Sequence, residues 1–167
     1  MKGGSMKHIH RIALLALALA GGSHASELHQ PRSHLLTGGQ PSARQLHEAA
    51  ATGVTTVIDL RAPQEDRGYD EQAAAEKLGL RYVRLPIDGA GDINEANART
   101  LDRLLKQDAG TTLLHCASGN RVGALLALAH ARVDGASAEE SLELGRAAGL
   151  TSLEPAVRAV LEDPAKP

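Results

Sequence analysis

The chain has 167 residues, with 18 lysines and arginines against 20 aspartates and glutamates, and carries a formal net charge of −2. It contains no phenylalanine or tryptophan and only two tyrosines, so it lacks the basic surplus and the aromatic platforms that nucleic-acid binding uses. A single cysteine excludes an internal disulfide and a cysteine-type zinc cluster, and the histidines show no metal-ligand spacing. We therefore expect no nucleic-acid partner, no metal and no cofactor.

The first 25 residues have the three parts of a secretory signal peptide. Three basic residues come first, residues 12–20 are apolar, and residues 23–25 have the small-x-small form that signal peptidase cuts after. We expect cleavage after Ala25 and a periplasmic or otherwise exported protein without stable membrane insertion, an uncleaved anchor being the alternative. The remaining 142 residues, with 15 basic against 20 acidic side chains, suit one domain. We expect a lead-in over residues 26–37 and the folded domain over residues 38–163.

Along the chain, apolar, β-branched and capping residues predict alternating helices and strands. Ser42 with Gln45 and Ser137 with Glu140 have the capping-box spacing that opens a helix, and Asn94 is a third cap. Strands are expected at residues 54–60, 80–85 and 111–115, and helices at 42–51, 69–78, 94–107, from the loop ending at 121 to about 133, 137–147 and 153–161. Such alternation suits parallel crossovers, so we expect an α/β fold with a mainly parallel central sheet and helices on both faces.

The most informative segment lies between the strand ending near residue 115 and the helical run 124–129. It reads Cys116, Ala117, Ser118, Gly119, Asn120, Arg121. A helix N-terminus leaves backbone N–H groups unpaired and carries the positive end of the helix dipole, so residues 117–121 are expected to bind an anion. The same field favours thiolate over thiol, which would make Cys116 more nucleophilic at neutral pH than a free cysteine. Arg121 adds a planar fork that holds two oxygens of a phosphate-like group.

The alternative for Cys116 is a small buried hydrophobe, which is the usual environment of a free cysteine. Packing alone does not explain Gly119 and Arg121 at their spacings after a strand, so we favour a reactive thiol. His115 directly precedes the cysteine, where its ring is able to orient the loop by hydrogen bonding.

Ligands of parallel sheets bind beyond the carboxyl ends of the strands, where three loops are expected here. These loops are residues 61–68, 86–93 and 116–121. The second contains Asp88 and Asp92, and a carboxylic acid above an anion cradle is able to protonate a leaving oxygen. Because both aspartates lie beside glycine, as turn residues do, the pattern leaves a catalytic and a turn role open for each.

Three other short motifs accompany the cysteine loop. They are Gly38-Gly39-Gln40-Pro41, Val57-Ile58-Asp59-Leu60-Arg61 and the stretch LRYVRLP at residues 80–86. With residues 115–121 they resemble the bacterial family called beta-lactamase hydrolase-like, phosphatase-like domain, a branch similar to the cysteine-dependent tyrosine and dual-specificity phosphatases. The resemblance covers about residues 36–133.

This resemblance implies a three-layer cysteine-phosphatase-like fold and hydrolysis of phosphoric monoesters through a phosphocysteine. It implies Cys116 as nucleophile, Arg121 as clamp, Asp88 as general acid, and Ala117, Ser118, Gly119, Asn120 and Arg121 as the substrate-binding loop. The family name does not imply β-lactam hydrolysis, because no serine or zinc constellation for that reaction is visible.

Two departures from tyrosine phosphatases keep other functions open. Cys116 and Arg121 are separated by four residues rather than five, a loop length that also resembles rhodanese sulfurtransferases, which act through a persulfide. Val122 stands where phosphatases usually place a serine or threonine whose hydroxyl eases departure of the thiolate. The leading hypothesis is a cysteine phosphatase acting on a small oxyanion or phosphorylated substrate. The alternatives are a sulfurtransferase with a Cys116 persulfide and a non-catalytic oxyanion-binding module.

Overall fold

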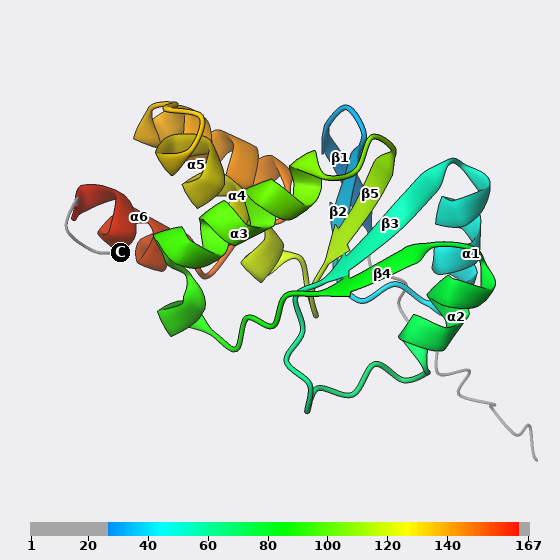
Figure 1. The fold of residues 1–167 in the computed structure, drawn as a ribbon. Coiled ribbons are helices and arrows are strands. Elements are labelled where there is room, and N and C mark those ends of the chain that lie inside the picture. Colours follow the sequence, from blue (N-terminus) through cyan, green and yellow to red (C-terminus); the bar gives the residue numbers. More distant parts are fainter. Residues whose placement is uncertain (1–26, 164–167) are drawn as a thin grey trace, which may run out of the picture.

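The computed structural model describes residues 27–163, which form a five-stranded sheet with helices on both faces (Figure 1). The strands are β1 (Leu28–Arg32), β2 (Leu35–Gly38), β3 (Val54–Asp59), β4 (Arg81–Arg84) and β5 (Thr111–His115). Their order across the sheet is β1-β2-β5-β3-β4, in which only β1 runs antiparallel to its neighbour. The predicted α/β class with a mainly parallel sheet is confirmed. The expected signal peptide, residues 1–25, lies outside the described residues.

The helices follow the predicted order. They are α1 (Ala43–Ala51), α2 (Glu71–Lys77), α3 (Glu95–Lys106), α4 (Asn120–Arg132), α5 (Ala138–Ala147) and α6 (Glu154–Glu162), with a short 3₁₀ turn, η1 (Ala90–Asp92), inside the expected loop 86–93. Ser42 and Ser137 each form the predicted capping box, and the side chain of Asn94 accepts the first-turn N–H of Asn97. No helix within residues 27–163 is long and apolar enough to cross a membrane.

Residues 28–38, which largely coincide with the expected lead-in 26–37, form a hairpin at the edge of the sheet that the predicted strands did not include. β2 lies parallel to β5, with Leu35 beside Thr112 and Gly38 beside His115. The turn between β1 and β2 contains His34 at a φ of 59°. The segment is polar and rich in histidine; β2 is stabilised by pairing with β5, whose residues lie 77 positions further along the chain, and β1 pairs with β2.

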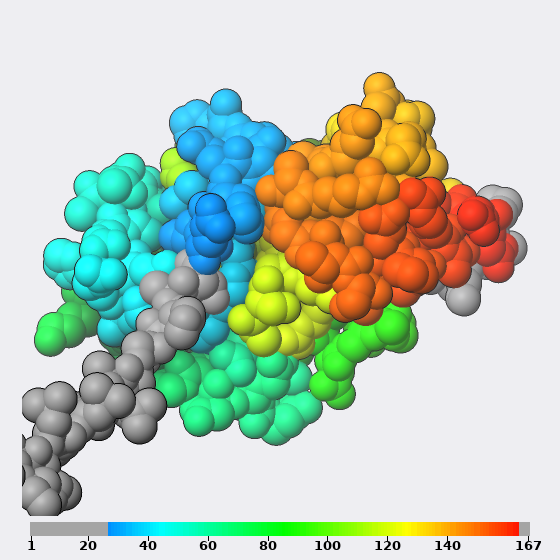
Figure 2. Space-filling view, turned by 180° about the vertical axis from the view of Figure 1, so that it is seen from behind, coloured from blue at the N-terminus to red at the C-terminus, as the bar shows by residue number. Residues whose placement is uncertain are grey.

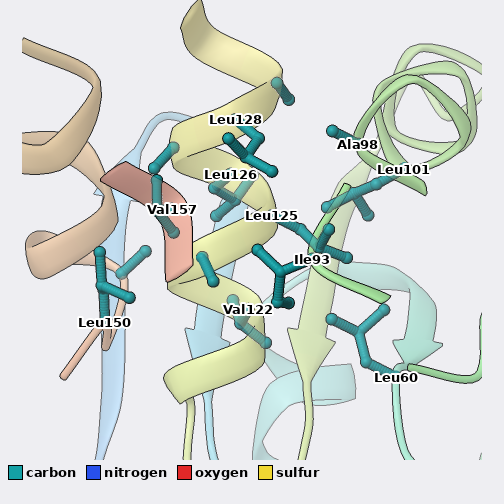
Figure 3. Close-up of a cluster of buried hydrophobic side chains, with 14 of the residues drawn as sticks. Leu60, Ile93, Ala98, Leu101, Val122, Leu125, Leu126, Leu128, Leu150 and Val157 are labelled. Atoms are coloured by element: carbon teal, nitrogen blue, oxygen red, sulfur yellow. The ribbon is translucent and has the colours of Figure 1, made fainter. Parts of the chain in front are cut away.

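The central strands send alternate side chains into two separate cores. On one face Val57 and Leu113 pack against Leu46 of α1 and Ala75 of α2. On the other face Ile58 and Leu114 belong to a larger core that includes α3, α4 and the C-terminal helices (Figure 3). Residues 122–129 of α4 are all buried, which makes α4 the central helix of this second layer.

Glycines let the turn after α5 approach the first turn of α4. A Cβ atom on Gly123 would overlap the backbone of Leu150 and of Gly145. Gly149, at a φ of 111°, lies against Gly119, since a Cβ on Gly149 would come within 3.1 Å of the Gly119 carbonyl oxygen. The start of α4 therefore packs closely against the backbone of residues 145–150.

Candidate active site

The segment after β5 continues alongside residues 38–40. The N–H of Cys116 donates to the carbonyl of Gly38 at 3.3 Å, and the N–H of Gln40 donates to the carbonyl of Ala117 at 3.2 Å. Gly39 and Ser118 form an isolated antiparallel bridge. A Cβ on Gly38 would lie 2.8 Å from the Leu28 side chain, so the first glycine of this motif lets β1 pack against the strand that supports the cysteine loop.

The loop from Cys116 to Arg121 curls into the N-terminus of α4, as the sequence predicts. Gly119 is the N-cap residue, at a φ of 89°, and no side chain caps the helix. Cys116 is fully buried, and its Sγ accepts the N–H of Gly119 at 3.1 Å. Ala117 and Ser118 are exposed. The loop therefore combines an uncapped helix start with a sulfur that is held by a backbone donor, which is an arrangement suited to negative charge.

Arg121 is held by Glu65 from the loop that follows β3. Its Nη1 donates to Glu65 Oε1 at 2.7 Å and its Nη2 donates to Oε2 at 2.8 Å, while Nη1 also donates to the carbonyl of Ile87 at 2.6 Å. The hydrogen bond from Arg121 lowers the pKa of Glu65 to about 2, and the same bond raises the pKa of Arg121 above its ordinary value. The pair is fully ionised at neutral pH.

One edge of the Arg121 guanidinium takes no part in the bonds to Glu65 and Ile87. The bonds to Glu65 and Ile87 use three of the five guanidinium N–H groups, and the Nε hydrogen and one Nη2 hydrogen form the remaining edge. Cys116 also raises the pKa of Arg121, through a coulombic interaction and a side-chain hydrogen bond, so the sulfur lies next to the guanidinium.

Asp88 lies on the loop that Arg121 contacts through Ile87. Its side chain is exposed and accepts from Gln64 Nε2 at 3.3 Å. Asp92 has a different role, because its Oδ2 accepts the backbone N–H of Asp88 at 2.8 Å and its backbone carbonyl accepts from Asn97. The structure thus places Asp88 on a loop tied to Arg121 and places Asp92 within the turn that shapes that loop.

Asn120 joins the cysteine loop to the segment before α6. Its Oδ1 accepts the N–H groups of Thr151 and Leu153 at 2.9 and 3.2 Å, and its Nδ2 donates to Ser152 Oγ at 2.7 Å. Figure 2 shows the yellow atoms near residue 120 at the surface, bordered by orange atoms from the region near 150 and by blue, cyan and green atoms from earlier segments. The Asn120 side chain therefore ties the cysteine loop to residues 151–153.

A buried polar cluster lies beneath the loop, on the α1 and α2 face of the sheet. Asp59, Glu71 and His115 offer ligand atoms that all lie within 4.8 Å of one another. Asp59 Oδ2 already accepts from Arg67 Nε at 2.7 Å and from the Tyr82 hydroxyl at 2.8 Å, and Asp59 Oδ1 accepts the N–H of Arg61 at 2.8 Å. We interpret the cluster as an ion-pair and hydrogen-bond network rather than a metal centre, because Asp59 is paired with Arg67 and Glu71 Oε2 already accepts from Gln40 Nε2.

Comparison with known proteins gives the same class as the fold. A sequence model of the family described as "DSP-PTPase phosphatase fused to NAD+ Kinase" matches residues 10–156, and the chain belongs to this phosphatase family. The "Beta-lactamase hydrolase-like protein" of Xylella fastidiosa strain Temecula1 is 36% identical over 120 residues. That match covers 69% of this chain but only 27% of the relative, so the chain spans about a quarter of the length of that protein.

Solved structures of phosphatases share the fold. A putative phosphatase from Neisseria meningitidis superposes with a TM-score of 0.67 and 23% identity, covering 79% of this chain and 94% of that one. TpbA from P. aeruginosa in complex with pTyr has a TM-score of 0.63 at 20% identity, covering 84% of this chain and 90% of its own. The expected cysteine-phosphatase-like fold is confirmed.

Sequence reasoning did not identify the partners of Arg121. It placed the loop 61–68 at the correct edge of the sheet but gave no role to Glu65, and it did not foresee the Ile87 carbonyl as an acceptor. A carboxylate in a strand-end loop beside an expected arginine clamp was the available signal. Because Asp66 is adjacent, the sequence alone does not show which carboxylate turns toward the arginine.

Proposed function

We propose that this chain is a cysteine-dependent phosphoric monoester hydrolase of the tyrosine or dual-specificity type. The observation that carries the proposal is the fixed orientation of Arg121, which Glu65 and the Ile87 carbonyl hold with one edge of its fork available close to Cys116. Membership of a phosphatase family supports the reaction class. The complex of TpbA with pTyr, a protein of the same fold, supports a phosphorylated aryl ester as substrate.

In the proposed first step, oxygens of the phosphoryl group accept from the backbone N–H groups of residues 117–121 and from the free edge of Arg121. The Cys116 thiolate attacks phosphorus, the ester P–O bond breaks, and Asp88 donates its proton to the leaving oxygen. In the second step water attacks phosphorus, the S–P bond breaks, and Asp88 takes the proton of that water. The thiolate is restored and inorganic phosphate leaves.

The assignment of Asp88 rather than Asp92 as proton donor rests on the partners of the two side chains. The Asp92 carboxylate is occupied by the backbone N–H of Asp88, whereas the Asp88 carboxylate is exposed and has only a long contact with Gln64. Asp88 directly follows Ile87, so the Arg121 bond holds this loop beside the site.

A second candidate is sulfur transfer, which the four-residue spacing between Cys116 and Arg121 and the apolar Val122 favour. In this reaction the Cys116 thiolate would attack the outer sulfur of a thiosulfate-like donor, the S–S bond would break and sulfite would leave. The resulting Cys116 persulfide would pass its outer sulfur to a nucleophilic acceptor. Val122 is buried, and its apolar side chain has no hydroxyl that could assist departure of the thiolate from a phosphocysteine.

The two candidates are separated by assaying the purified protein side by side with an aryl phosphate and with thiosulfate plus cyanide. We expect hydrolysis of the aryl phosphate, its loss in Cys116→Ser, and a loss of at least about 100-fold in Arg121→Lys, because lysine keeps the charge but not the paired geometry. Asp66→Asn, an exposed substitution in the same loop as Glu65, is the control and should keep wild-type activity. Thiosulfate turnover without phosphatase activity would replace the first candidate by the second, and activity with neither donor would favour an oxyanion-binding module.

We also propose that residues 1–25 direct export, because their charge and apolar pattern is that of a signal peptide. Cell fractionation and N-terminal sequencing of the exported protein test this. The mature chain is expected to begin at Ser26. Retention in the cytoplasm with an intact N-terminus would contradict the proposal.

A further inference from the structure

The two ends of the cysteine loop are connected beneath the site by a continuous series of side chains. At the Arg121 end, Glu65 Oε2 accepts from Arg61 Nε at 3.1 Å in addition to its bond with Arg121. Arg61 is 8% exposed, and its Nη2 donates to the carbonyl of Asp66 at 2.7 Å. Arg61 therefore fixes both the carboxylate and the backbone of the loop that orients Arg121.

Gln40 forms the junction of this series. Arg61 Nη1 donates to Gln40 Oε1 at 2.6 Å, and Gln40 Nε2 donates to Glu71 Oε2 at 2.9 Å. Because an amide accepts at one end and donates at the other, it joins a cation to an anion without adding charge. Gln40 comes from the Gly-Gly-Gln-Pro motif, to which the proposed reaction assigns no chemical role.

At the Cys116 end, Glu71 contacts the residue that precedes the nucleophile. Glu71 Oε1 lies 2.9 Å from His115 Nε2, within ion-pair distance, and neither of these buried atoms forms a hydrogen bond among residues 27–163. His115 Nδ1 lies 3.3 Å from the carbonyl of Cys116, which only accepts, so Nδ1 carries a hydrogen. Glu71 and His115 are 1% and 0% exposed, so this contact is shielded from water.

We propose that Gln40 and Glu71 are positioning residues of the active site. Arg61, Gln40 and Glu71, which we call the Gln40 network, link the Glu65–Arg121 pair to His115 and so fix the spacing between the clamp and the nucleophile. The proposal rests on the proposed roles of Cys116 and Arg121, but neither Gln40 nor Glu71 contacts the reacting atoms.

The backbone bonds to residues 38–40 and the Asn120 bonds hold the loop itself, but they do not include the Arg121 guanidinium, whose placement relative to His115 depends on the Gln40 network. The position of the Arg121 guanidinium depends on Glu65, and the position of Glu65 depends on Arg61. The position of Cys116 depends instead on the backbone of His115. Breaking the junction at Gln40 lets these two halves relax separately. Displacements of about 1 Å in such a site are enough to weaken binding of the transition state strongly.

An exchange of side chains between positions 40 and 71 tests the network. Gln40→Glu keeps the acceptor for Arg61 but turns a carboxylate oxygen toward the Glu71 carboxylate. Glu71→Gln leaves one acceptor oxygen for the two contacts that Glu71 makes with Gln40 Nε2 and His115 Nε2. Each single variant therefore breaks a link. The double variant Gln40→Glu/Glu71→Gln restores a donor facing an acceptor between positions 40 and 71 and keeps the acceptor for Arg61, while the longer bond from Gln40 Nε2 to the Pro41 carbonyl, at 3.3 Å, is lost. The binding readout is protection of Cys116 from iodoacetamide by inorganic phosphate, which requires no turnover, and KM and kcat are measured alongside.

We expect each single variant to weaken phosphate protection about tenfold and the double variant to recover to within about threefold of the wild type. Thermal unfolding checks that each variant is folded, and the isosteric Glu71→Gln with the double variant carries the test if Gln40→Glu does not fold. The control is the same exchange at Gln72 and Glu76, an exposed pair on α2 joined at 2.9 Å, which should leave protection unchanged.

Three results would overturn the proposal. Folded single variants with wild-type protection would show that the network has no influence on the site. Loss without recovery in the double variant would show that the effect does not depend on the paired contacts. Absence of phosphate protection in the wild type would overturn the anion loop itself, and with it both this proposal and the proposed function.

Discussion

Both carboxylate oxygens of Glu65 accept hydrogen bonds from the Arg121 guanidinium, at 2.7 and 2.8 Å. The two residues are 56 positions apart and belong to loops at the same edge of the sheet. Since Glu65 also contacts Arg61 and the N–H of Ala62, it is fixed before any ligand arrives. Arg121 is therefore preorganised by the protein rather than by its substrate.

Replacing Glu65 by glutamine should weaken the clamp while keeping the side-chain shape. An amide offers one oxygen and no charge, so one of the two bonds to Arg121 is lost and the other is weakened. We expect kcat/KM for an aryl phosphate to fall about 10- to 100-fold in Glu65→Gln. Steady-state kinetics measure this.

The matched control for this substitution is Glu48→Gln. Glu48 pairs with Arg44 on the surface of α1, and its side chain is 58% exposed, so the change should alter neither activity nor stability measurably. Equal kinetics for Glu65→Gln and Glu48→Gln would show that Arg121 does not depend on its carboxylate partner.

The pKa of Glu65 predicts how stability depends on pH. The hydrogen bond from Arg121 lowers this pKa from 4.5 to about 2, so Glu65 stays ionised in the folded protein where it would be protonated in the unfolded chain. The stabilisation is fully present above about pH 4.5 and is lost as the pH falls to about 2. Urea unfolding of the wild type and Glu65→Gln across this range should show that the difference in their free energies of unfolding shrinks as the pH falls. A difference that does not change with pH would contradict the predicted linkage.

Substituting Asp88 by asparagine tests the proton donor. A general acid contributes a factor of roughly 10²–10⁴ when the leaving oxygen needs a proton and little when it does not. Asp88→Asn should therefore slow hydrolysis of an alkyl phosphate far more than that of a nitrophenyl phosphate. The dependence of kcat/KM on the leaving-group acidity measures this.

Asp92→Asn serves as the control for Asp88→Asn, because an asparagine oxygen still accepts the Asp88 N–H. It should change the rate only slightly with either ester. If Asp92→Asn showed the leaving-group dependence and Asp88→Asn did not, the two assignments would have to be exchanged.

Local signals were sufficient to predict most of the fold. The capping boxes at Ser42 and Ser137 and the cap at Asn94 lie within a few residues of what they stabilise, so the start of each helix can be recognised in the sequence. The β1–β2 hairpin was missed because its stability comes from pairing with β5 far along the chain. No local sequence pattern in residues 26–37 predicts that pairing.

In the candidate site too, some features follow from local sequence and others depend on residues far apart in the chain. Cys116 and Arg121 fall within one short loop, so their proximity follows from the motif. Glu65, Gln40 and Glu71 come from three separate elements and meet only through tertiary packing. Their partners could not be chosen from the sequence, in which other carboxylates and amides lie nearby.

The most direct test of the proposed function is the covalent state of Cys116 during turnover. The protein is mixed with an aryl phosphate, quenched in acid within milliseconds to seconds, digested, and the peptide containing Cys116 is examined by mass spectrometry, with a parallel sample treated with thiosulfate. The proposal predicts a phosphoryl group on Cys116 that forms with the release of the phenol and is absent from Cys116→Ser. An added sulfur atom on Cys116 after thiosulfate, with no phosphoryl group and no phenol release after the ester, would contradict it.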